Sequence, residues 1–210
     1  VSLDLETTGL SADDDQIIEV GAVKFQGSRT LDTYQSLVNP YQNLSSFITR
    51  YTGITQREVD KAPPFSAVAR ELAPFVGTAP IVGHNIAFDL GFLASHGLRL
   101  TNSRSDTWDL AFVLLPELPE YALAKVAASL GIGHPRPHRA VDDADVTRAL
   151  FLKLADMAAE LSKAQLLAYQ LGSDPYVTTE AVKRRMGYLP PEADTYSVPY
   201  MHVDGVHGFH

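Results

Sequence analysis

Four acidic residues and one histidine stand in segments that are otherwise mostly apolar. They are Asp4, Glu6, Asp89, His138 and Asp143, in the segments VSLDLETTG, GHNIAFDLGFL and HRAVDDADVTRAL. Carboxylates are rarely buried among apolar residues unless they pair with a positive charge or bind a cation. Three such segments, without matching basic residues, indicate a divalent-cation site and therefore a metal-dependent hydrolase.

The first segment has the pattern of a β-strand. Val1, Leu3 and Leu5 are apolar and alternate with polar residues, a period of two. The alternation places Asp4 and Glu6 on the same face, roughly 7 Å apart at about 3.3 Å per residue. Two carboxylates at that spacing can hold one cation or share two. The alternative is a half-solvated strand whose outer face is acidic.

The second segment has the pattern of a helix buried on most sides. We predict that Asn85 is its N-cap and that Gly97 ends it. The intervening IAFDLGFLASH is apolar nearly all round, and Asp89 shares a stripe with Ile86 and Leu93. No cation follows Asp89 at helical spacing, so this acid needs a partner from elsewhere. A backbone or hydroxyl group is the alternative to a metal.

The third segment predicts a helix over residues 141–161 with Asp143 on its apolar stripe. Asp142 and Asp145 lie to either side, where the dipole of the first turn favours negative charge. His138 precedes Asp143 by five residues in the proline-stiffened loop GHPRPHRA. A histidine in such a loop is ordinarily a surface residue, but its place beside a metal site makes it a catalytic candidate.

These segments resemble the motifs of DEDDh 3′–5′ exonucleases, a branch of a superfamily with a ribonuclease-H-like fold. The first family motif, Asp-x-Glu-Thr-Thr-Gly, is matched by residues 4–9. The second, His-Asn-x-x-Phe-Asp, is matched by residues 84–89. The third, a histidine followed five positions later by Asp-Ala, is matched by His138, Asp143 and Ala144.

Other stretches are similar to the proofreading and repair members of this family. They are YTGIT at residues 51–55, followed by Ala62-Pro63, and DTWD at residues 106–109. The resemblance covers roughly residues 1–154. It implies a proofreading-subunit-like protein, or the exonuclease domain of a polymerase or helicase fusion, that acts in DNA replication or repair.

The resemblance also implies a two-metal mechanism that releases nucleoside monophosphates from the 3′ end of DNA. Hard oxygen ligands favour two Mg²⁺ ions, with Mn²⁺ as a substitute. Asp4 would bridge the ions, Glu6, Asp89 and Asp143 would complete their coordination, and His138 would deprotonate the attacking water. The implied substrate contacts are Thr7, Thr8, Gly9, Leu10 and Asn85. For Asn85, helix capping is the favoured role.

The composition is that of a water-soluble globular protein. The 210 residues are 45% hydrophobic and 20% charged, enough for one domain plus an appendage. The lack of cysteine excludes disulfides, thiolate catalysis and cysteine-based zinc sites, and fits a cytoplasmic location. No apolar run approaches the length of a membrane span, and no signal peptide is recognisable.

The net charge of −8 contrasts with the basic surface of most nucleic-acid-binding proteins. Bound cations would offset part of it, and an exonuclease needs to grip only a few terminal nucleotides. Arg136 and Arg139 flank His138, and we expect them to meet phosphates. We therefore expect weak, salt-sensitive binding of 3′ ends, above all of single-stranded DNA, unless another domain contributes.

The remaining pattern predicts an α/β fold: a ribonuclease-H-like mixed central sheet with flanking helices, followed by a helical to irregular C-terminal extension. Beyond the first strand, strands are predicted at 17–25, 30–38 and 79–83, with a short one ending near 108. Helices are predicted at 56–61, 66–76, 110–115 and 122–130.

We predict an exonuclease domain over residues 1–155 and an extension over 156–210 that joins a further domain. The chain begins inside a strand, without methionine, and its last residues lack a clear periodic pattern. We therefore expect a fragment of a larger protein, fused to or associated with a polymerase or helicase. The predicted features of the extension are a second helix capped by Ser162, a basic helix over 179–186 with Lys183, Arg184 and Arg185, and a tail containing His202, His207 and His210.

Three other functions are compatible with parts of the pattern. A phosphatase with an aspartate nucleophile would need a second aspartate where Glu6 stands. A non-catalytic binding module would be expected to have lost an acid or the histidine. An exoribonuclease on the same fold remains open, since 2′-hydroxyl contacts cannot be assigned from sequence. The 51–55 stretch favours DNA.

Overall fold

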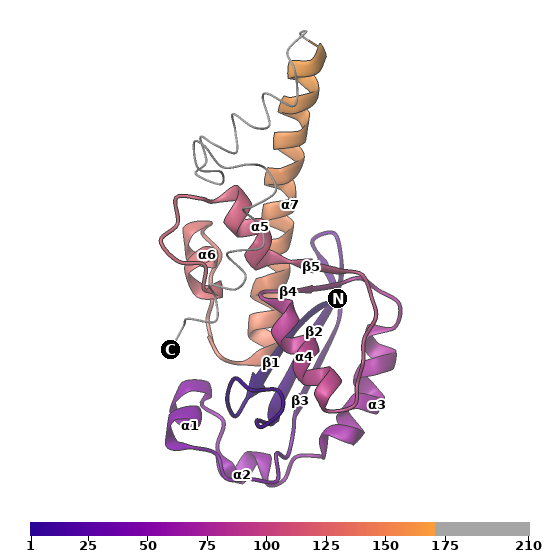
Figure 1. The fold of residues 1–210 in the computed structure, drawn as a ribbon, viewed down its shortest axis with the longest axis vertical. Helices are drawn as coiled ribbons and strands as arrows, with labels where there is room; N and C mark the ends of the chain where they lie inside the picture. Colours follow the sequence, from indigo (N-terminus) through magenta and orange to yellow (C-terminus); the bar gives the residue numbers. More distant parts are fainter. Residues whose placement is uncertain (171–210) are drawn as a thin grey trace. The chain divides into compact units, whose positions relative to one another are not determined.

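The fold is built on a mixed five-stranded sheet (Figure 1). The computed structural model describes the backbone of residues 1–170 and the side chains of residues 1–160. The strands are β1 (Ser2–Thr7), β2 (Ile17–Gln26), β3 (Arg29–Leu37), β4 (Ile81–Gly83) and β5 (Arg104–Asp106). Their order is β3-β2-β1-β4-β5; the first three pair antiparallel, whereas β4 and β5 pair parallel. The predicted strands and sheet type are confirmed.

Seven helices accompany the sheet within residues 1–170. They are α1 (Ser46–Thr52), α2 (Gln56–Val59), α3 (Phe65–Val76), α4 (Ile86–Ser95), α5 (Thr107–Leu114), α6 (Leu123–Ser129) and α7 (Ala140–Gln170). Helix α1 was not predicted from the sequence, because it is short and buries only two residues. Ser45 caps its start by accepting a hydrogen bond from the backbone of Ile48, and Gly53 ends it in the left-handed conformation.

The prediction of a separate helix beginning at Ser162 was wrong. Helix α7 runs through this position without a break. The surrounding residues are mostly strong helix formers, so one serine within the helix is tolerated. The expected basic helix over 179–186, with Lys183, Arg184 and Arg185, and the C-terminal histidines lie outside the described residues.

The chain divides into two compact units. Among the described residues, the first contains residues 1–109 and 120–153, and the second contains residues 110–119 and 154–170. All residues of the three acidic motifs belong to the first unit, which includes the start of α7 up to residue 153. Within residues 1–170, none of the helices is long and apolar enough to cross a membrane.

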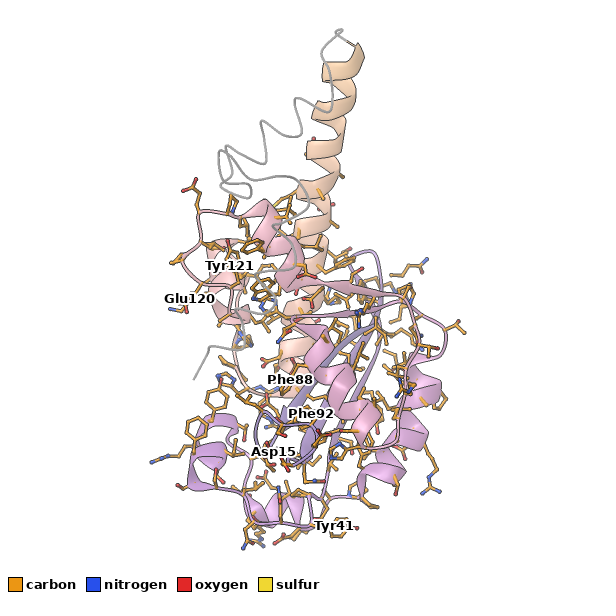
Figure 2. The ribbon with its side chains drawn as sticks, in the orientation of Figure 1. Asp15, Tyr41, Phe88, Phe92, Glu120 and Tyr121 are labelled. Atoms are coloured by element: carbon orange, nitrogen blue, oxygen red, sulfur yellow. The ribbon has the colours of Figure 1, made fainter. Side chains whose placement is uncertain are left out.

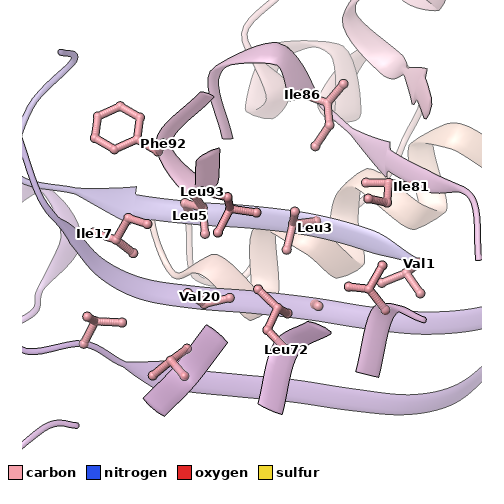
Figure 3. Packing of buried hydrophobic residues seen from close by; sticks show 14 residues of the cluster. Val1, Leu3, Leu5, Ile17, Val20, Leu72, Ile81, Ile86, Phe92 and Leu93 are labelled. Carbon is pink, nitrogen blue, oxygen red and sulfur yellow. The ribbon is translucent and has the colours of Figure 1, made fainter. Parts of the chain in front are cut away.

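The two faces of the sheet differ in character. Leu3 and Leu5 of β1 point to the face that packs on α3 and α4, where Leu72 and Leu93 complete an apolar core (Figure 3). The alternate residues of β1, including the two acids, therefore point to the opposite face.

The start of α7 packs directly on that opposite face. Gly21 of β2 pairs with Asp4, and a Cβ atom on Gly21 would lie 2.1 Å from the backbone of Ala140. A larger residue at position 21 would therefore push α7 away from the sheet. This close approach brings the first turn of α7 next to the acids of β1.

Candidate active site

The acids of β1 lie next to an open edge of the strand. Strand β4 pairs with β1 through Ser2 and Val82, so residues further along β1 lack a β4 partner. Asp89 of α4 occupies this edge, where its Oδ1 atom accepts a hydrogen bond of 3.0 Å from the backbone N–H of Leu5. The backbone partner that the sequence left as an alternative for Asp89 is therefore present. The same carboxylate also lines the cavity described below.

Asp106 organises the start of α4, a role that the sequence did not predict. Its carboxylate accepts hydrogen bonds from the backbone N–H groups of Asn85 at 2.8 Å, Ile86 at 2.9 Å and Trp108 at 2.9 Å. Asn85 occupies the N-cap position, but its backbone is left-handed and its side chain does not cap the helix. The prediction of Asn85 as the N-cap residue is confirmed in position, but the end of β5 supplies the hydrogen-bond acceptor in place of the Asn85 side chain.

Two histidines contact Asp143 in the first turn of α7. Nε2 of His134 is hydrogen-bonded to Oδ1 of Asp143 at 2.5 Å, and the backbone N–H of His138 donates to Oδ2 at 3.1 Å. His138 has a left-handed backbone with φ of 65°. His134 was not predicted from the sequence, although it stands in the same loop and only nine residues before Asp143.

The ring of His138 lies on an aromatic stack. It packs against Tyr51 of α1 with ring centroids 3.7 Å apart, and Tyr51 packs against Phe47 at 5.5 Å. Phe47 and Tyr51 are 61% and 49% exposed, although both are aromatic. Helix α1 thus presents aromatic surface to the candidate general base.

Glu19 is a further buried acid next to the site, and it was not predicted from the sequence. It is fully buried on β2, directly opposite Glu6 in the sheet register. Its carboxylate accepts hydrogen bonds from the guanidinium of Arg139, the backbone N–H of Ala140 and the side chain of Gln35. The rule applied to the other acids would have found it, because Glu19 interrupts the buried run IIEVGAV.

The two arginines beside His138 bind acids of the protein. Arg139 pairs with Glu19 at 2.7 Å, and Arg136 pairs with Asp142 at 3.0 Å. Each guanidinium thus has a carboxylate within direct reach in this structure. That the two arginines meet phosphates stays a prediction.

The turn after β1 is held by its own polar side chains. Asp15 accepts hydrogen bonds from the hydroxyl of Thr8 and the backbone N–H of Ser11, and Figure 2 shows its place in the loop. Thr7 donates to the carbonyl of Gly9 at 2.6 Å. Leu10, at the tip of the turn, is 79% exposed.

These side chains surround one cavity of about 420 Å³ within the first unit. Of the ten residues that the sequence singled out, Thr8 is absent from its lining. Phe88 of α4, labelled in Figure 2, adds an aromatic wall together with Tyr51 and Phe47. The predicted residues that line the cavity are Asp4, Glu6, Thr7, Gly9, Leu10, Asn85, Asp89, His138 and Asp143.

Burial and mutual repulsion make the acids of the cavity difficult to ionise. Burial raises the pKa of Glu6 to about 8, with further contributions from Asp143 and Glu19. Burial also raises the pKa of Asp89 to about 8. The pKa of Asp4 is raised well above its usual range, first by burial and then by the charges of Asp89 and Asp143.

Asp143 and His138 titrate in the same environment. Burial raises the pKa of Asp143, against the hydrogen bond from His134, which lowers it. Burial lowers the pKa of His138, against the charge of Asp143, which raises it. A histidine with a lowered pKa is neutral near pH 7 and can accept a proton.

The donor set of the cavity fits a divalent cation. Glu6, His138 and Asp143 each offer a ligand atom, and these atoms lie within 4.8 Å of one another. Acids with raised pKa values are stabilised by a bound cation, which favours their charged forms. Carboxylate oxygens are the ligands that Mg²⁺ and Mn²⁺ prefer.

Comparison with known sequences agrees with this chemistry. A family model described as exonuclease (RNase_T) matches residues 1–151. A PolC-type DNA polymerase III of Clostridium perfringens is 42% identical over 151 residues, which cover 70% of this chain and 10% of the relative. The 3′-5′ exonuclease DinG of Bacillus subtilis is 35% identical over 167 residues, covering 77% of this chain and 18% of that protein. The chain thus spans less than a fifth of the length of either relative.

Solved structures share the fold. Exonuclease X in complex with 5′ overhanging duplex DNA superposes with a TM-score of 0.65 at 23% identity, over 75% of this chain and 92% of that one. The nuclease domain of 3′hExo, a DEDDh family member bound to rAMP, gives a TM-score of 0.63 at 22% identity, over 74% and 90% of the two chains. The predicted fold class, a ribonuclease-H-like mixed sheet with flanking helices, is confirmed.

Proposed function

The chain belongs to the exonuclease family, its residues 1–151 form a 3′–5′ exonuclease domain, and we propose that this domain removes nucleoside monophosphates from the 3′ end of DNA. The observation that carries the proposal is the single cavity lined by acids from β1, α4 and α7 together with His138. The relatives named DNA polymerase III PolC-type support DNA over RNA as the proposed substrate of this chain.

Four carboxylates of the cavity are proposed to hold divalent cations: Asp4, Glu6, Asp89 and Asp143. They come from three elements that the fold brings to one place, and each of their pKa values is raised. Bound divalent cations would neutralise charge on the phosphate and make the attacking water more acidic. We assign Mg²⁺ as the physiological ion, with Mn²⁺ as a substitute, and two ions as the stoichiometry.

His138 is proposed to take the proton from the attacking water. Its lowered pKa keeps the ring neutral near pH 7, and its ring lies beside Glu6 and Asp143. The stack on Tyr51 restricts where the ring can lie. A role of His138 as a metal ligand is the competing assignment, since one of its nitrogens lies within 4.8 Å of both acids.

The 3′-terminal nucleotide is proposed to bind along the turn after β1 and the start of α4. Thr7, Gly9, Leu10 and Asn85 line the cavity, and Leu10 exposes its side chain beside the acids. Thr8 is bonded to Asp15 instead, so its proposed contribution is to shape the turn. Single-stranded 3′ ends are the proposed substrate, because an unpaired terminal nucleotide can enter the cavity without a cost for melting.

Residues 1–155 are proposed as the catalytic domain, and residues 156–210 as a junction to another domain. The match of the family model to residues 1–151 supports this boundary. The chain covers only 10% to 18% of the length of these two relatives. We propose that it works attached to a larger replication or repair protein, with a polymerase or helicase as the candidate. The proposed location is the cytoplasm.

One assay tests the proposal. Oligonucleotides labelled at the 5′ end are incubated with the protein and Mg²⁺ as single-stranded DNA, duplex DNA with a mispaired 3′ end, paired duplex DNA and RNA. We expect stepwise shortening from the 3′ end, fastest on single-stranded DNA and slower on paired duplex.

Two outcomes would contradict parts of the proposal. Faster shortening of RNA than of DNA would assign the domain to RNA processing. Cleavage inside the strands, or no cleavage of any substrate with Mg²⁺ or Mn²⁺, would refute the proposed reaction. A reaction with EDTA in place of the metal serves as the control.

A further inference from the structure

We propose that Glu19 is a positioning residue that acts on His138 through Arg139. It is not itself one of the proposed metal ligands or the proposed base. It binds Arg139 and Ala140, the two residues that follow His138 in the chain. The inference rests on the proposed role of His138 as the general base.

The first observation is the number of bonds that Glu19 makes to the histidine loop. Oε1 accepts from Nη2 of Arg139 at 2.7 Å, and Oε2 accepts from Nε at 3.1 Å. Oε2 also accepts from the backbone N–H of Ala140 at 3.0 Å. The two-point contact fixes the direction of the guanidinium as well as its distance.

The second observation is how these bonds combine with those of the neighbouring residues. His138 donates its backbone N–H to Asp143, while Arg139 and Ala140 are bound to Glu19. Three consecutive residues are therefore tied to the sheet and to the first turn of α7. His138 keeps a left-handed backbone in this arrangement, a conformation that is uncommon for residues other than glycine.

The third observation is the rigid seat of the carboxylate itself. Glu19 is fully buried on a central strand, and Gln35 of β3 donates a further hydrogen bond of 2.7 Å to its Oε1. Gly21, two residues along the same face, lets the start of α7 approach the strand closely. Glu19 thus fixes the position of the histidine loop relative to β2, the strand that pairs with β1.

Stability alone does not account for an acid at this position. A buried ion pair is often no more stabilising than apolar residues of similar size, because both charges lose their water. Glu19 also lies opposite Glu6 in the sheet, next to the proposed metal ligands. Its carboxylate is nevertheless bonded to Arg139 and Ala140, so a task at the histidine loop explains an acid at this position better.

The variant Glu19→Gln tests the proposal with little change in volume. Its amide NH₂ would face donors of Arg139, Ala140 or Gln35, so the two-point contact is lost. With single-stranded DNA and saturating Mg²⁺, we expect kcat to fall about 10- to 100-fold, while KM for DNA and the Mg²⁺ concentration for half-maximal rate stay near the wild-type values.

Arg139 supplies a second, graded pair of variants. Lysine keeps the positive charge but cannot make the two-point contact, and methionine keeps neither. We expect the order of kcat to be wild type, then Arg139→Lys, then Arg139→Met. The matched control is Asp145→Asn, which removes the acid of an ion pair with Arg148 elsewhere on α7 and should leave kcat unchanged.

A double-mutant cycle with His138→Ala distinguishes positioning from a general structural effect. If Glu19 acts through His138, adding Glu19→Gln to His138→Ala should lower kcat by less than about twofold, because there is no base left to position. Folding of each variant is checked by circular dichroism and thermal unfolding.

If the wild type is active, any of three results would overturn the inference. The first is an unchanged kcat in Glu19→Gln, and the second is an undiminished effect of Glu19→Gln in the His138→Ala background. The third is a selective loss of Mg²⁺ affinity in Glu19→Gln, which would make Glu19 part of the metal site. An inactive wild-type protein would instead refute the proposed function on which the inference rests.

Discussion

Asp89 of α4 binds the backbone N–H of Leu5, the residue that separates the two acids of β1. The bond is 3.0 Å long and lies where β1 extends beyond its pairing with β4. It fixes a helix acid against the strand acids by a contact that does not depend on charge. Geometry and charge at Asp89 can therefore be separated by mutation.

Asp89→Asn should keep the bond to Leu5, since the amide oxygen can accept it, but lose the negative charge. We expect thermal stability to be preserved and Mg²⁺-dependent kcat to fall at least about 100-fold. Asp89→Ala should lose both, with a further loss of about 1 kcal/mol in the free energy of unfolding. Full activity of Asp89→Asn in a single-turnover assay would exclude this acid from the metal site.

Glu6 gives a prediction for the pH dependence of stability. Its pKa is about 8 in the folded, metal-free protein, against about 4.3 in an unfolded chain. Between these pH values the unfolded state binds fewer protons, so the contribution of Glu6 to stability becomes less favourable as the pH rises from about 4 to about 8.

Glu6→Gln removes this titration. In EDTA, we expect the variant to have a Tm roughly 3 °C or more above wild type at pH 8, and nearly the same Tm at pH 4.5. Adding Mg²⁺ at pH 8 should raise the Tm of the wild type more than that of the variant. A Tm difference that does not change with pH would contradict the raised pKa of Glu6.

Tyr51 should affect turnover through its ring face. Tyr51→Phe keeps the surface on which His138 lies, and Tyr51→Ala removes it. Aromatic pairs of this kind contribute about 1 kcal/mol, so we expect Tyr51→Ala to lower kcat roughly fivefold to tenfold and Tyr51→Phe to retain it. Equal loss in both variants would point to the hydroxyl group instead of the ring.

His134 should affect the metal dependence. Its Nε2 is hydrogen-bonded to Asp143, and groups that orient a metal ligand typically change metal affinity by about 10- to 100-fold when removed. We expect His134→Ala to raise the Mg²⁺ concentration for half-maximal rate about tenfold. At saturating Mg²⁺ its kcat should stay well above that of His138→Ala. An equal loss of kcat in both variants would contradict the assignment of different roles to the two histidines.

Much of the fold was predictable because its elements have strong local patterns. The period of two in residues 1–6 and the apolar runs around Asp89 and Asp143 predicted a strand and two helices that the structure contains. Helix α1 escaped prediction because it is held mainly by its caps and buries only Ile48 and Thr52. The continuity of α7 through Ser162 was misjudged because a serine is also tolerated inside a helix of good formers.

The acids of the candidate site were predictable because they interrupt apolar patterns. Asp4, Glu6, Asp89 and Asp143 were found in this way, and they line one cavity. The other predicted residues of the lining came from the resemblance to the exonuclease motifs. Contacts between distant segments could not be predicted, such as those of Asp106 with the start of α4 and of Glu19 with Arg139. Local patterns carry no information on which side chain will arrive from another element, whether 21 or 120 residues away.

The central claim is that the acids of β1, α4 and α7 form one divalent-cation site that drives hydrolysis. Its most direct test is Mn²⁺ binding, followed by the electron paramagnetic resonance of the free ion, in wild type and in Asp4→Asn, with exonuclease activity measured on the same samples. We predict that wild type binds Mn²⁺ in proportion to its activity and that Asp4→Asn loses both. Wild-type activity that persists in EDTA, or unchanged Mn²⁺ binding by Asp4→Asn, would contradict the claim.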